Sequence, residues 1–150
     1  MKKFVFSLQA LLNYKETVER TQKAELKRAQ QILRELQEEE MRLLTAYSDN
    51  EISLERALRE RTDIVTALAE HDAYFRYLRN ALIEVREKII RAERVVSECQ
   101  TRLITTMREL KTYNKLRNEQ YLEYLKEVQM EEEKEIGDLV SYNTVIEEAN

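Results

Sequence analysis

Residues 78–117 read LRNALIEVREKIIRAERVVSECQTRLITTMRELKTYNKLR. Apolar residues recur along this stretch in alternating steps of four and three, and ten of the twelve positions in the series are apolar. A 3.5-residue repeat that holds for about five heptads predicts a helix packed against another helix in a left-handed coiled coil. The positions of this seam are Leu78, Leu82, Val85, Ile89, Ala92, Val96, Cys99, Leu103, Thr106, Leu110, Tyr113 and Arg117.

A second seam with the same spacing lies earlier in the chain, and eight of its ten positions are apolar. Two seams in one chain predict two helices that face each other. The predicted fold is therefore all-α, a long two-helix antiparallel coiled-coil hairpin. The positions of the earlier seam are Leu26, Ala29, Leu33, Leu36, Glu40, Leu43, Tyr47, Asn50, Leu54 and Ala57.

The composition agrees with a rod of long helices. The 150 residues include no proline and one glycine, Gly137, and 36% of them are charged. Proline breaks helices and glycine supplies left-handed turns, so the chain has material for only one or two corners. Such a protein buries a seam of side chains and has no three-dimensional core.

Two places could hold the corner between the helices. Residues 48–51, Ser-Asp-Asn-Glu, have the pattern of a capping box, and residues 62–66, Thr-Asp-Ile-Val-Thr, are polar and β-branched. The earlier seam continues past Ser48, which favours the second place. We predict one rod over residues 1–150, with helix one at about 8–61, the corner at about 62–66 and helix two at about 67–147.

The two ends of the predicted hairpin differ. The earlier seam is weak near the N-terminus, where Lys15, Glu19 and Gln22 occupy seam positions, so we expect an open, under-packed end where a partner enters. Roughly the last 25 residues of helix two should extend beyond helix one. From Glu127 to Asn150 the chain has eight acidic residues and one basic residue, a net charge of −7. Residues 76–117 hold eleven basic and five acidic residues, so the rod is electrically polarised.

Motifs for catalysis, cofactors and metals are absent. One glycine excludes the glycine-rich phosphate loops, and a single cysteine, Cys99, excludes an internal disulfide and multi-cysteine metal sites. The only histidine, His71, reads as a packing or surface residue. We therefore predict a protein that is not an enzyme, binds no cofactor and no nucleic acid, inserts no segment into a membrane, and resides in the reducing cytoplasm.

Aromatic residues gather just after the predicted corner, where Tyr74, Phe75 and Tyr77 precede Leu78. One seam buries one or two of three aromatics within four positions, because each residue turns the side chain by about 100°. At least one should face a partner, and Tyr74 and Phe75 are the expected outward residues. A wider core at the hairpin tip is the alternative.

Four segments resemble motifs of the FliJ family, and they occur in the family's order along nearly the whole chain. Residues 4–16, FVFSLQALLNYKE, resemble its N-terminal motif, and residues 73–78, AYFRYL, resemble its aromatic motif. Residues 113–120, YNKLRNEQ, are similar to its basic motif. Residues 134–138, KEIGD, lie where the family usually has Lys-x-Leu-Asp-Glu, and Gly137 replaces the aspartate.

The resemblance implies a component of the bacterial flagellar type III export apparatus, with a role in flagellum biogenesis, motility and chemotaxis. Members of the family are antiparallel coiled coils similar to the stalk of rotary ATPases. They sit in the hexameric export ATPase FliI, reach the membrane gate protein FlhA and are linked to export chaperones. The chain would then be a monomer when free, located in the cytoplasm and peripherally associated with the cell membrane through this apparatus.

The resemblance and the seams together predict two contact sites. The end with the termini should contact the ATPase ring, through Leu8, Leu11, Leu12, Tyr14, Lys15, Tyr121 and Tyr124. The corner should contact the export gate, through Tyr74, Phe75, Tyr77 and Leu78.

Other functions use the same heptads. A homodimeric coiled-coil scaffold would pair its seams between chains, and a curvature-sensing membrane module would need a basic face. The equivalent stalk of a virulence type III injectisome is a third alternative.

Overall fold

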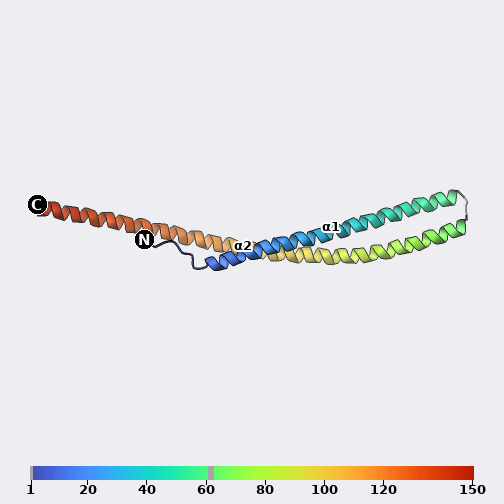
Figure 1. Ribbon diagram of the computed structural model, residues 1–150, viewed down its shortest axis with the longest axis horizontal. Helices are drawn as coiled ribbons and strands as arrows, with labels where there is room; N and C mark the ends of the chain where they lie inside the picture. The colour runs from blue at the N-terminus through green and yellow to red at the C-terminus, as the bar shows by residue number, and fades with distance from the viewer. Residues whose placement is uncertain (1, 61–62) are drawn as a thin grey trace. The chain divides into compact units, whose positions relative to one another are not determined.

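The computed structural model describes residues 2–60 and 63–150. They form two α-helices, α1 at Gln9–Arg59 and α2 at Ile64–Ala149 (Figure 1), and none of these residues lies in a strand. The two helices pack against each other, so the predicted all-α helical hairpin is confirmed. Within the described residues, neither helix has a stretch long and apolar enough to span a bilayer.

The chain divides into two compact units. The terminal unit consists of the residues up to Arg20 together with Ile104–Asn150, and the hairpin unit is Thr21–Leu103. In each unit α1 and α2 run antiparallel. In the hairpin unit, Tyr47 contacts Phe75, and Asn50, which comes after Tyr47, contacts His71, which comes before Phe75, as antiparallel helices require.

Both predicted seams are removed from solvent. All ten positions of the seam on α1 are buried or half-buried, and so are eleven of the twelve on α2. The exception is Arg117, which is exposed. The two seams pair with each other within one chain. A homodimeric scaffold would instead pair them between two chains.

The corner lies earlier than predicted. Ser48 is inside α1, as expected, but residues 64–66 form the first turn of α2, and Thr62 lies outside the described residues. Asp63 explains the early start, because its carboxylate accepts hydrogen bonds from the Thr66 backbone N–H at 3.4 Å and from the Thr66 hydroxyl at 2.6 Å. These bonds hold the pKa of the Asp63 carboxyl below its ordinary value. An aspartate at this position satisfies free N–H groups of the first turn, which outweighs the low helix propensity of the β-branched residues.

The terminal unit is closed where the sequence predicted an open end. Phe6, Leu12 and Leu110 form a buried cluster, with Leu12 only 2% exposed. Phe4, Leu8, Tyr113 and Leu116 pack against it. The aromatic side chains that precede α1 close this unit beyond the start of α1.

The predicted unpaired end of α2 is present. Every residue from 129 to 150 is exposed, although α2 remains helical to Ala149. Figure 1 shows this stretch of the terminal unit continuing with no second helix beside it.

Candidate partner-binding surfaces

The residues predicted to contact the ATPase ring lie in the terminal unit but differ in accessibility. Leu12 is buried, and Leu8 and Leu11 are half-buried. The three leucines therefore hold α1 in place more than they offer a surface. Tyr14 and Tyr121 are 62% and 44% exposed and are available to a partner.

Lys15 pairs with a residue of the same unit. Its Nζ lies 2.5 Å from a carboxylate oxygen of Glu109 on α2. The hydrogen bond to this carboxylate raises the pKa of the Lys15 ammonium above its ordinary value. The lysine thus links α1 to α2, and any partner that takes its charge must compete with Glu109.

An aromatic cluster ties the N-terminal segment to α2. The Phe4 ring lies 5.2 Å from the Tyr121 ring and 5.6 Å from the Tyr124 ring, between centroids. The Tyr124 hydroxyl donates a hydrogen bond of 2.7 Å to the backbone carbonyl of Lys2. Tyr124 is accordingly half-buried and holds the segment in place. Sequence reasoning missed Phe4 as part of this surface, although its aromatic motif was visible.

The aromatic residues after the corner divide into two kinds. Phe75 packs on Tyr47 of α1 at 4.8 Å between ring centroids, and Leu78 is 1% exposed. Tyr74 and Tyr77 are 43% and 64% exposed, and their rings stack on each other at 6.2 Å. The expectation that Tyr74 points outward is confirmed, but Phe75 points inward and Tyr77 takes its place. One turn separates Phe75 from the buried Leu78, so both face α1.

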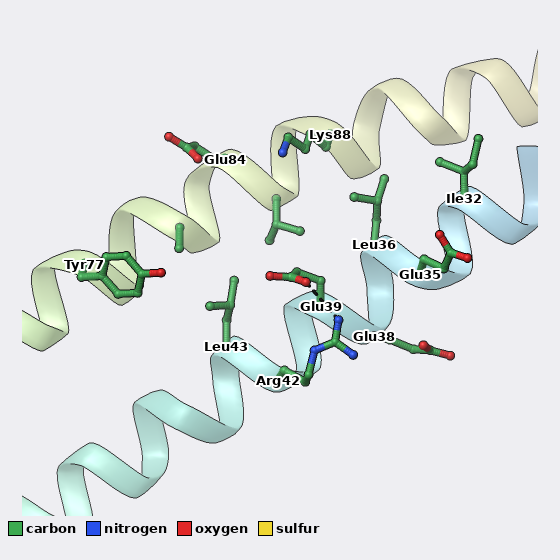
Figure 2. Close-up of a pocket in the computed structure, with 12 residues that line it drawn as sticks. Ile32, Glu35, Leu36, Glu38, Glu39, Arg42, Leu43, Tyr77, Glu84 and Lys88 are labelled. Carbon is green, nitrogen blue, oxygen red and sulfur yellow. Dashed lines mark hydrogen bonds and ion pairs between the residues drawn. The ribbon is translucent and has the colours of Figure 1, made fainter.

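A groove runs between α1 and α2 of the hairpin unit, with a volume of about 710 Å³. Figure 2 shows Leu36 and Leu43 of α1 pointing toward α2, and Tyr77 of α2 lining one end of the groove. Ionic side chains surround this apolar floor, and Arg42 is paired with Glu39 at 2.9 Å. The charged residues are Glu35, Glu38, Glu39, Arg42, Glu84 and Lys88.

The groove therefore fits an apolar side chain that is flanked by basic groups, because carboxylates outnumber cations around it. The sequence did not reveal it. Its two walls come from positions beside each seam, and these positions meet only once the register of the helices is known.

A polar link joins the helices near the corner. Asn50, 8% exposed at a seam position, donates from Nδ2 to the backbone carbonyl of His71 at 3.1 Å. His71 Nδ1 donates to the Ala67 carbonyl at 2.6 Å, and Nε2 lies 3.3 Å from the Ser53 hydroxyl. This half-buried histidine connects α1 to α2. No three His, Cys, Asp or Glu residues of the described chain are placed to hold a metal ion.

Comparison with known families adds an assignment to this geometry. The family model described as "Flagellar FliJ protein" matches residues 4–145. No curated protein and no solved structure matches the chain.

Proposed function

Because the chain belongs to the flagellar FliJ family, we propose that it is the central stalk of the flagellar export ATPase. Membership by itself makes it a coiled-coil protein associated with flagellar export. In the proposal, the terminal unit contacts the hexameric ATPase FliI and the hairpin unit contacts the membrane gate FlhA. Export chaperones are the third class of partner.

The observation that carries the proposal is the pair of tyrosines on the closed terminal unit. A stalk has to stay folded while it touches ring subunits, so its anchors must be separate from its own packing. Tyr14 meets this requirement, because it is 62% exposed. Tyr121 meets it in part, because it is 44% exposed although its ring also contacts Phe4. Tyrosine is enriched among the residues that dominate binding energy at protein interfaces.

The gate contact is supported by the hairpin unit in the same way. Tyr74 and Tyr77 form a stacked, exposed pair, and Tyr77 also lines the groove. Phe75 and Leu78 face the other helix instead, so they pack inward and hold the two tyrosines in position.

The two assignments are tested together by a crossed pair of variants of the full chain. Tyr14→Ala with Tyr121→Ala should reduce the stimulation of ATP hydrolysis by FliI and leave binding to FlhA unchanged. Tyr74→Ala with Tyr77→Ala should weaken binding to FlhA and leave the stimulation unchanged. Both double variants should stay folded with only a slightly lower melting temperature, because all four residues are exposed and each double variant loses only ring contacts of about 0.5–1 kcal/mol.

Each double variant is the control for the other. If the first pair leaves the stimulation of ATP hydrolysis intact, the ring contact is wrong. If the second pair leaves FlhA binding intact, the gate contact is wrong. Deletion of residues 1–14 would be a poorer test, because it removes Phe6 and Leu12 from the buried cluster.

A further inference from the structure

The end of α2 has an apolar surface that nothing in the described chain covers. Six large apolar side chains occur among residues 136–146, and each is 41–64% exposed. Four of them follow one another in steps of three and four, which places them on one side of the helix. This tail stripe consists of Ile136, Leu139, Tyr142 and Ile146.

The tail stripe is on the side of α2 that already serves as an interface. Tyr142 is two heptads after Val128, which is half-buried, and Tyr124 one turn earlier binds the N-terminal segment. Heptad-related positions share one side of a helix in a coiled coil. A second helix packed on the tail stripe would therefore continue the packing of α2 beyond Tyr124, where α2 contacts the N-terminal segment, and beyond the half-buried Val128.

Charge decides what kind of helix fits. Residues 127–150 have eight acidic side chains and one basic side chain. Glu135 directly precedes the stripe and Glu132 lies one turn before Ile136, while Asp138 and Glu147 adjoin its members in sequence. Nucleic acid, an anionic membrane surface and the tail of a second copy are all repelled by such a surface. A helix that presents apolar side chains between lysines or arginines is attracted to it.

We propose that residues 132–146 of α2 are a docking site for a basic amphipathic helix of a partner protein. The inference goes beyond the ring and gate contacts, because it uses neither Tyr14 and Tyr121 nor the residues near the corner, although the tail belongs to the same terminal unit as the proposed ring contact. Binding would bury the tail stripe against the partner's apolar side chains and place its basic side chains beside Glu132, Glu135 and Glu147.

The probe is a synthetic helical peptide of about 20 residues, with leucines at heptad positions and lysines beside them. Its control has the same leucines and glutamates in place of the lysines. Titration calorimetry with the full chain should detect binding of the lysine peptide only. Leu139→Gln with Ile146→Gln should weaken this binding at least about ten-fold, since both side chains would lie in the interface.

A matched variant, Ile83→Gln with Ile90→Gln, changes two residues of the hairpin unit that are 57% and 60% exposed, and it should bind as the wild type does. The stripe variant keeps every charge of the tail. Unchanged affinity in that variant would mean attraction by charge alone and would overturn the proposal.

Two further results would also overturn it. One is tail-dependent dimerisation of the free chain in sedimentation, which would make a second copy the occupant. The other is tail-dependent binding to anionic lipid vesicles, which would make a membrane surface the occupant.

Discussion

Replacing Leu78 with alanine should destabilise the hairpin unit much more than replacing its neighbour Tyr77. Leu78 is 1% exposed, so the change leaves a cavity in the seam. Such changes cost about 2–4 kcal/mol, which corresponds to about 6–12 °C in melting temperature at roughly 3 °C per kcal/mol for a chain of this size. Tyr77 is 64% exposed and loses mainly its stacking on Tyr74, about 0.5–1 kcal/mol.

The assay is thermal unfolding followed by far-ultraviolet circular dichroism, repeated at two protein concentrations. A melting temperature that is the same at both concentrations shows that the seam is closed within one chain. FlhA binding, measured below the melting temperature of the weaker variant, adds the second readout. Tyr77→Ala should lose gate affinity, and Leu78→Ala should retain it in the folded fraction.

Equal melting temperatures for Leu78→Ala and wild type would refute the burial of Leu78 and with it the register of the hairpin unit. A loss from Tyr77→Ala as large as that from Leu78→Ala would refute the division of the aromatic motif into inward and outward residues.

Three further changes test other parts of the chain. Asn50→Leu should raise the melting temperature but add a larger species in size-exclusion chromatography, because a buried asparagine fixes register at a cost in stability; a lower melting temperature with one monomer peak would contradict this. Asp63→Ala should melt below wild type at neutral pH, and the gap should close as pH falls below 3.8, the ordinary pKa of the group. The folded state lowers the pKa of Asp63, so the ionised carboxylate stabilises the fold above the unfolded-state pKa, and this stabilisation is lost as the carboxylate becomes protonated. Gly137→Ala should increase helix content and stabilise the end of α2 by about 1 kcal/mol, since an added Cβ meets nothing within 4 Å; unchanged ellipticity would contradict this.

The seams could be predicted from the sequence because burial in a coiled coil depends on spacing along a single helix. Every position of the earlier seam and all but Arg117 of the later one are removed from solvent. The corner was predicted too late because the low helix propensity of residues 62–66 was considered as a group. One capping side chain, Asp63, determines where α2 begins.

The errors at the candidate sites share a different cause. Phe6 closes the terminal unit and Phe75 turns inward because each meets a partner that is distant in sequence, Leu110 for Phe6 and Tyr47 for Phe75. Such pairs depend on the register between the helices, which a heptad pattern leaves open by whole turns. Residues whose position depended on one helix alone, such as Tyr74, were predicted correctly.

Exposed apolar side chains are informative in this chain only where they gather. Among the described residues, 27 large apolar side chains are exposed, and single ones are ordinary on a protein surface. They gather along the tail stripe, whereas only Ile32 and Tyr77 among them line the groove, and the charges around these two surfaces differ. Beside the groove, Glu39 and Glu40 are paired with Arg42 and Arg86, whereas the tail has one base for eight acids. Exposed charges are screened by salt, so added salt should weaken a partner on the tail more than one in the groove. Binding at the two surfaces can therefore be distinguished by its dependence on ionic strength.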